Sequence, residues 1–124
     1  MQTIMKILRK YPYSVLIALA IWVVCMIPIP ETPLSSLSFV DKWTHFLMYG
    51  IFTIVILWEH RRLSFVLLLL PIIQGIVIEF VQTYLTTCRS GEWFDALCNT
   101  LGVLLGALLF WSLRKTKKSK KATQ

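Results

Sequence analysis

Residues 63–85 read LSFVLLLLPIIQGIVIEFVQTYL, and this stretch decides the fold. It is apolar over the ~20 residues that an α-helix needs to cross ~30 Å of hydrocarbon. Near its end, however, it carries Glu79 and Gln82. An ionisable side chain in lipid costs roughly 2.5–3.5 kcal/mol even on a lenient insertion scale, so it is rarely found there without a use. The stretch therefore predicts a transmembrane helix that carries a functional or firmly paired carboxylate.

Three other stretches, residues 13–30, 39–58 and 93–113, are apolar over similar lengths. The whole chain is 56% hydrophobic and 15% charged, whereas soluble domains average about 25% charged residues. We expect an all-α, polytopic membrane protein: one domain over residues 1–124, with a bundle of four transmembrane helices at about 13–30, 39–58, 63–85 and 93–113. The second helix is the weakest prediction, because Asp41, Lys42 and His45 crowd its start.

Two features lie around the first predicted helix. Lys6, Arg9 and Lys10 precede it as they would in a signal peptide, but the apolar run exceeds the usual ~7–15 residues and no A-x-A pattern follows it. We therefore expect a retained helix. After it, residues 27–38 read IPIPETPLSSLS, whose prolines and serines predict an extended, Pro-rich outer loop.

The basic residues predict the orientation. Of the 13 Lys and Arg residues, all except Lys42 and Arg89 lie before residue 13, at Arg61 and Arg62, or in residues 114–124. The positive-inside rule then places both termini in the cytoplasm, with residues 114–124 as a basic cytoplasmic tail. Attraction to anionic lipid, about 1 kcal/mol per basic residue, explains this charge. No basic face with interleaved aromatic residues accompanies it, so we expect no binding to nucleic acid.

Polar residues in three of the predicted helices gather near the outer membrane surface. On the second helix their i, i+4, i+8 spacing puts them on one face, and the predicted topology brings the other two helices to a similar depth. This predicts a polar pocket that opens outward. The candidate residues are Asp41, Lys42, His45, Tyr49, Glu79, Gln82, Arg89, Asp95 and Asn99.

Within this set, His45 and Glu79 are the candidate acid/base pair. A glutamate well inside a membrane helix is hard to explain as a helix cap, and an imidazole in the same layer is its natural partner. Clusters of this kind are typical of active sites, although a buried ion pair that holds the bundle together is the alternative. The other residues are candidate binding residues, among which Arg89 in an outer loop is placed to hold an anion.

Several of these binding candidates also have structural explanations. Asp41 and Asp95 lie in first turns of predicted helices, where a carboxylate caps free N–H groups. Lys42 can extend to outer headgroups. Asn99 precedes Gly102 and Gly106 on one stripe, a small-residue pattern that favours close helix packing.

Other chemistry is weakly indicated. His45, Glu79 and Asp95 are too few and too far apart in the sequence to indicate a zinc site, because zinc sites use several His or Cys residues at short spacing. We therefore expect no metal and no cofactor. Cys88 and Cys98 are both predicted near the outer face, but their spacing alone leaves open whether they pair. No serine in this layer has a base beside it, so a serine triad is not supported.

Three motifs resemble the VanZ-like family. They are D-K-x-x-H-F-x-x-Y at residues 41–49, E-x-x-Q at 79–82 and R-x-x-x-x-x-D-x-x-x-N-x-x-G at 89–102. The resemblance implies a small multi-pass protein of the bacterial cytoplasmic (inner) membrane, with its motif residues facing outward. The founding member of the family is linked to low-level resistance to teicoplanin, a glycopeptide antibiotic that acts on cell-wall precursors. The resemblance names this context without naming a reaction.

Two classes of function follow. In the first, the pocket acts on or binds a membrane lipid, or a lipid-linked or glycopeptide-related ligand of the cell envelope, at the outer face. In the second, the protein is a non-catalytic scaffold or partner-binding protein whose polar cluster is structural. The lack of an obvious nucleophile favours binding or a reaction that uses water. The sequence leaves open whether the protein is an enzyme, and it does not indicate the oligomeric state.

The topology is directly testable. Because the basic residues divide so unevenly between the two faces, residues 34–41 and 86–92 should lie outside. Cysteines placed at Ser36 and Ser90 should react with a membrane-impermeant thiol reagent in intact cells. Labelling that requires the inner face to be opened first would contradict both the orientation and the outward-facing pocket.

Overall fold

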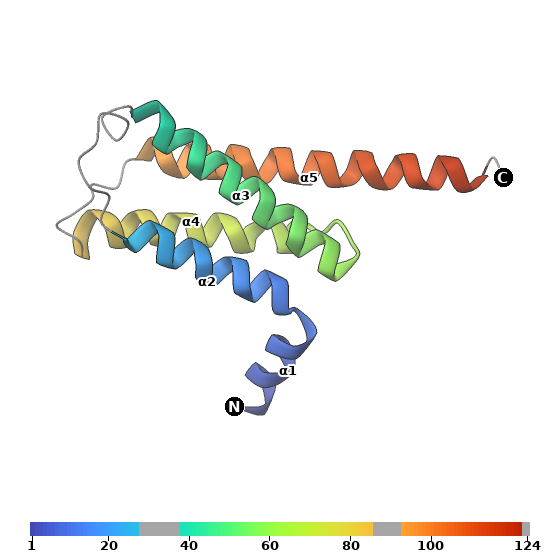
Figure 1. Ribbon diagram of the computed structural model, residues 1–124, viewed down its shortest axis with the longest axis horizontal. Helices are drawn as coiled ribbons and strands as arrows, with labels where there is room; N and C mark the ends of the chain where they lie inside the picture. The colour runs from blue at the N-terminus through green and yellow to red at the C-terminus, as the bar shows by residue number, and fades with distance from the viewer. Residues whose placement is uncertain (28–37, 86–92, 123–124) are drawn as a thin grey trace.

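The computed structural model describes residues 1–27, 38–85 and 93–122, and all regular structure within these ranges is helical. The helices are α1 (Gln2–Lys10), α2 (Pro12–Met26), α3 (Ser38–His60), α4 (Phe65–Leu85) and α5 (Trp93–Ala122), arranged as Figure 1 shows. In the described ranges α3, α4 and α5 are each long and apolar enough to cross a membrane. The predicted all-α class is confirmed.

The first predicted helix, residues 13–30, differs from what is observed. Tyr11 leaves the helical conformation (φ −133°, ψ 57°), since a residue before proline is pushed out of the α region, and Pro12 opens a new helix. The 15 residues of α2 rise about 22 Å, less than the thickness of the hydrocarbon. Only as a pair bent by 97° do α1 and α2 pass as a further span. Residues 28–37, most of the predicted Pro-rich loop, lie outside the described part of the chain.

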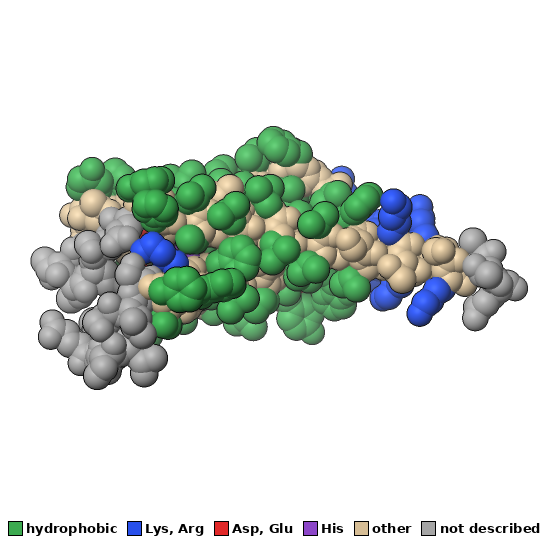
Figure 2. Space-filling model, turned by 90° about the horizontal axis from the view of Figure 1, so that it is seen from above, with side chains coloured by type: hydrophobic (Ala, Val, Ile, Leu, Met, Phe, Trp, Pro, Cys, Tyr) green, Lys and Arg blue, Asp and Glu red, His purple; other side chains and the backbone are tan. Residues whose placement is uncertain are grey.

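The last helix runs further than the expected end at residue 113. It continues through the basic tail to Ala122 and extends beyond the other helices (Figure 1). Residues 107–122 contain neither glycine nor proline, and Lys, Arg and Leu are good helix formers. Figure 2 shows apolar side chains over the middle of the molecule and Lys and Arg side chains at the end of this helix. Such a pattern is typical of a membrane-embedded body with a charged end.

The backbones of α3 and α5 come into contact at glycines. A Cβ added at Gly102 would clash with the carbonyl of Phe46, and one at Gly106 would lie 2.5 Å from the carbonyl oxygen of Gly50. Lipid gives no hydrophobic drive for two helices to associate, so close packing of small residues must hold them together. The packing role predicted for the Gly102–Gly106 stripe is confirmed.

The N-terminus of α2 is capped by a residue from another helix. Glu59, near the end of α3, accepts hydrogen bonds from the backbone N–H of Tyr13 (2.9 Å) and of Ser14 (2.8 Å), and also from the Ser14 hydroxyl. The carboxylate thereby satisfies free N–H groups and faces the positive end of the helix dipole. Next to it, the rings of Tyr11 and His60 stack with centroids 3.9 Å apart. These contacts join the start of α2 to the end of α3.

The turn between α3 and α4 begins with a residue in the left-handed conformation. Arg61 has φ 55°, and its N–H donates to the carbonyl of Trp58. Glycine is the usual residue at this position after a helix, and a side chain there costs roughly 1–2 kcal/mol. An arginine is thus held where glycine would be the less strained residue.

The glycine contact yields a matched pair of variants. Gly102→Ala should lower the free energy of unfolding by about 1–3 kcal/mol, because its methyl group would overlap the backbone of α3, which cannot move aside like a side chain. Gly50→Ala is the control in the same interface, since its added Cβ would lie 3.4 Å from the Gly102 carbonyl oxygen, an ordinary contact. Thermal unfolding in detergent measures both. Equal tolerance of the two changes would contradict the packing described.

Candidate functional site

Polar residues from α3, α4 and α5 meet at the end of the molecule where α3 and α5 begin and α4 ends (Figure 1). We call this group the polar cluster. It contains most of the candidate residues from the sequence analysis. Four of its members, including His45, are more than nine-tenths buried. The members are Asp41, Lys42, His45, Glu79, Asp95 and Asn99.

His45 lies at the centre of the polar cluster, with 1% of its surface exposed. Its Nδ1 is 3.0 Å from Oδ1 of Asn99 and 3.7 Å from Oε1 of Glu79. An amide oxygen can only accept, so a proton on Nδ1 is donated to Asn99. On the other side of the ring, Nε2 is 3.9 Å from Oδ1 of Asp41. One imidazole therefore faces carboxylates from two helices and an amide from a third.

Asp41 and Lys42 form the more accessible edge of the polar cluster. The Asp41 side chain is 37% exposed, whereas that of Asp95 is 6% exposed. Lys42 Nζ lies 4.0 Å from Oδ1 of Asp95, which connects the first turns of α3 and α5 by opposite charges. Lys42 therefore does more than extend toward headgroups. His45 lies behind this edge, with 2% of its side chain exposed.

Tyr49 and Asn99 each have a buried hydrogen-bonding atom that makes no hydrogen bond within the described ranges. Tyr49 is fully buried one turn below His45, and neither its hydroxyl nor Nδ2 of Asn99 has a hydrogen-bond partner within the described ranges. A buried polar group without a partner costs about 1–3 kcal/mol, and each such group calls for an explanation such as a bound water or a ligand.

Three members of the polar cluster have the spacing of metal ligands. One oxygen each from Asp41 and Asp95 and one nitrogen of His45 all lie within 4.8 Å of one another. Two carboxylates and a single imidazole remain a sparse set for zinc, and Lys42 brings a positive charge to the same Asp95. The expectation that no metal or cofactor is needed stays a prediction.

One predicted binding residue, Gln82, makes a contact outside the polar cluster. Gln82 is buried, but its Nε2 donates to the backbone carbonyl of Cys25 at 2.8 Å and so joins α4 to α2. Gln74 makes the same kind of bond, at 2.8 Å, to the carbonyl of Ala18, a contact that sequence reasoning missed. The sequence signal for these contacts was the pair Gln74 and Gln82, two amide side chains about two turns apart on an apolar helix, because such side chains often donate hydrogen bonds to a neighbouring helix. Arg89, the predicted anion clamp, and Cys88 lie outside the described residues.

Sequence reasoning also missed a feature at the opposite end of the molecule. An open cavity of about 680 Å³ lies where the N-terminal segment, the end of α3 and the basic part of α5 come together. Its cationic lining residues had been interpreted as topology signals alone. The available signal was that three separate basic segments were predicted to lie on the same face of the membrane.

Comparison with known proteins gives a family and little further detail. A protein of the yeast Schizosaccharomyces pombe named "Uncharacterized protein C11E3.10" is 34% identical over 74 residues, which is 56% of this chain and 45% of the yeast protein. The chain thus spans less than half the length of that relative. No solved structure matches. The family model described as VanZ/LLP1 matches residues 1–114, in agreement with the motifs, and the chain therefore belongs to the VanZ/LLP1 family.

Proposed function

We propose that this single-domain protein crosses the bacterial cytoplasmic membrane four times, with both termini inside, and that its polar cluster binds or acts on a lipid-linked ligand from the outer face. The bent pair α1 and α2 would supply the first crossing. The asymmetric distribution of basic residues supports the orientation.

One observation carries the proposal. The buried His45 imidazole lies beside the Glu79 carboxylate (3.7 Å) and the Asn99 amide (3.0 Å), with the charged Asp41 and Lys42 at the accessible edge. Ionisable groups inside a membrane protein are costly and mark functional sites more often than structural ones. This arrangement supports a role in proton exchange for His45 and Glu79, with Asp41 and Lys42 at the entry to the site.

The chemistry suits an anionic headgroup. Lys42 supplies positive charge at the edge of the polar cluster, and Arg89 is proposed to hold the ligand from the adjoining outer segment. His45 and Glu79 are proposed to exchange protons with the bound ligand as general acid and base, each with a ligand atom within its own hydrogen-bond reach. Asp95 and Asn99 hold Lys42 and His45 in position.

The yeast relative favours a lipid ligand over a glycopeptide-related one. A match in a eukaryote means that the sequence similarity extends beyond bacteria. A ligand that both kinds of membrane contain, such as a phospholipid or another lipid with a charged headgroup, accounts for this more simply than a bacterial cell-wall precursor. A contribution to teicoplanin resistance would then follow from a changed envelope.

A structural role is the second candidate, and the tight contacts of His45 support it. The His45 imidazole is 1% exposed and hydrogen-bonded to Asn99 of α5, and this contact could hold α3 against α5. In that case, removing one partner of the buried group would mainly destabilise the protein.

The substitution Glu79→Gln separates the two candidates. It keeps the shape and most of the hydrogen bonding but removes the proton-exchanging carboxylate. If the polar cluster is a functional site, the variant should express and unfold like the wild type, yet fail to restore the lipid composition or antibiotic susceptibility altered by deleting the gene. Glu59→Gln is the matched control, because the same change there weakens the α2 cap at the other end of the molecule.

The control should lower thermal stability while its folded fraction still complements the deletion. A well-folded Glu79→Gln protein with normal activity would contradict the acid/base proposal. A variant that loses several kcal/mol of stability and is active when folded would instead support the structural role.

A further inference from the structure

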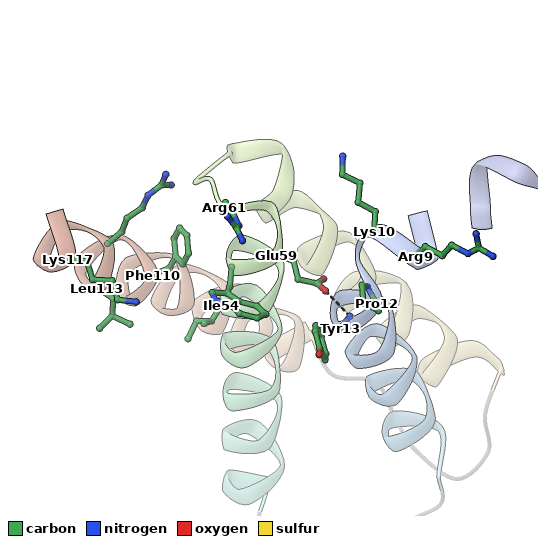
Figure 3. Close-up of a pocket in the computed structure, with 12 residues that line it drawn as sticks. Arg9, Lys10, Pro12, Tyr13, Ile54, Glu59, Arg61, Phe110, Leu113 and Lys117 are labelled. Atoms are coloured by element: carbon green, nitrogen blue, oxygen red, sulfur yellow. Dashed lines mark hydrogen bonds between the residues drawn. The ribbon is translucent and has the colours of Figure 1, made fainter. Parts of the chain in front are cut away.

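The cavity at the end opposite the polar cluster has a strongly cationic wall. Its volume is about 680 Å³, and its lining residues come from α1, the start of α2, α3, the turn after α3 and α5 (Figure 3). The basic residues that line it are Arg9, Lys10, Arg61, Arg114 and Lys117. These side chains come from three segments far apart in the sequence, which the fold brings to the wall of one cavity.

The acidic residue that lines the cavity, Glu59, already accepts hydrogen bonds from another part of the chain. Among the described residues that line the cavity, Glu59 is the one acid, and both of its carboxylate oxygens accept hydrogen bonds from the N-terminus of α2. Glu59 is therefore oriented toward Tyr13 and Ser14, as the dashed line to Tyr13 shows in Figure 3. The cavity keeps a positive net charge that an anion would balance.

Helix α1 places this cavity at a membrane surface. Ile4, Met5 and Leu8 lie on one face of the helix and Lys6 and Arg9 on the other, and none of its residues is buried. It turns 97° away from α2. An amphipathic helix across the end of a membrane helix lies in the interface between headgroups and acyl chains. Trp58, on the cavity wall and 62% exposed, is a typical interfacial residue.

The wall of the cavity also changes from charged to apolar. Ile54, Phe110 and Leu113 belong to the same lining as the cations, and the last two are carried by the α5 segment that leads into Arg114 and Lys117. A free phosphate ion would use only the cationic part. A phospholipid would use both, with its phosphate among the cations and its acyl chains along the apolar side chains. Basic pockets between helices at the cytoplasmic side bind lipid headgroups in this way.

We propose that this cavity binds the phosphate headgroup of an anionic phospholipid from the leaflet that borders the three basic segments. The site is separate from the polar cluster and does not depend on its function. Arg61 is its most informative residue, because it occupies a left-handed position (φ 55°) where glycine would be less strained, yet it lines the cavity. Its guanidinium suits a phosphate, to which it can donate two parallel hydrogen bonds.

The test measures phosphatidylglycerol binding to the full-length protein in detergent by native mass spectrometry, with phosphatidylcholine as the neutral lipid. Phosphatidylglycerol should bind more tightly. Arg61→Gly should weaken this binding about fivefold, and Arg61→Gly with Arg114→Gln about thirtyfold, as expected from the loss of one and two charges near a lipid surface. Since glycine relieves the left-handed backbone, Arg61→Gly should be at least as stable as the wild type.

Matched controls separate the cavity from general charge. Arg62→Gln removes the neighbouring charge in the same turn, and Lys120→Gln with Lys121→Gln removes two charges from α5 beyond the cavity lining. Both should leave phosphatidylglycerol binding within about twofold of the wild type, since their charges face open solvent. If the Arg61 variants fail to fold, Arg114→Gln with Lys117→Gln provides the same comparison.

Three results would overturn the proposal. The first is equal binding of the two lipids by the wild type. The second is an equal loss of binding in the cavity variants and the controls. The third is full competition by millimolar inorganic phosphate, which would show that the cations bind free phosphate and that the apolar wall contributes nothing.

Discussion

The close approach of the α3 and α5 backbones is the contact on which the rest of the structure depends. Gly102 and Gly106 allow α5 to lie directly against the carbonyls of Phe46 and Gly50. In lipid this packing replaces the hydrophobic effect as the reason for two helices to associate. It also sets the register between the helices: Asn99, one turn before Gly102, meets His45, which directly precedes Phe46. A shift of either helix by one turn would separate the imidazole from its amide partner.

From this contact the molecule divides into two ends of different chemistry. At one end, α4 adds Glu79 to the His45–Asn99 pair and completes a polar cluster with acids, a base and an accessible cation. At the other end, Glu59 caps α2, and cations from three segments surround a cavity. Hydrogen bonds donated by the side-chain amides of Gln74 and Gln82 to backbone carbonyls of α2 hold this helix along the bundle between the two ends. Each end thus has its own charged groups, which are separated by apolar helix surface.

Much of this arrangement could be predicted from the sequence. Long apolar stretches predicted α3, α4 and the apolar part of α5, because helical hydrogen bonding is the general solution for a chain in lipid. The helical spacing of Asp41 and His45 predicted their shared face, and the topology predicted that His45 meets Glu79 and Asn99. Such patterns succeed because helix geometry is regular and the membrane fixes the depth of each helix.

The remaining features depend on tertiary contacts or on local backbone detail. The end of α2 at Met26, the bend at Tyr11 and the left-handed Arg61 are local conformations that apolar periodicity does not encode. The hydrogen bond from Gln82 to α2 was not predicted, since an amide in an apolar helix has the same sequence pattern whether it binds a ligand or a neighbouring helix, and its binding role stays a prediction. The Glu59 cap and the basic cavity are formed by residues far apart in the sequence. The distribution of basic residues predicted that the three basic segments lie on one side of the membrane, but it did not predict that they line one cavity.

The central claim is that one imidazole joins three helices in a buried cluster, and solid-state NMR distance measurement in lipid bilayers tests it most directly. With ¹⁵N-labelled histidine and ¹³C-labelled asparagine and glutamate, the His45 ring nitrogens should show measurable dipolar coupling to the side-chain carbons of Asn99 and Glu79. This follows from the separations of 3.0 Å and 3.7 Å between Nδ1 and their oxygens. Coupling to Asn99 should disappear in Asn99→Leu. Absence of coupling to both side chains in the folded wild-type protein would contradict the account.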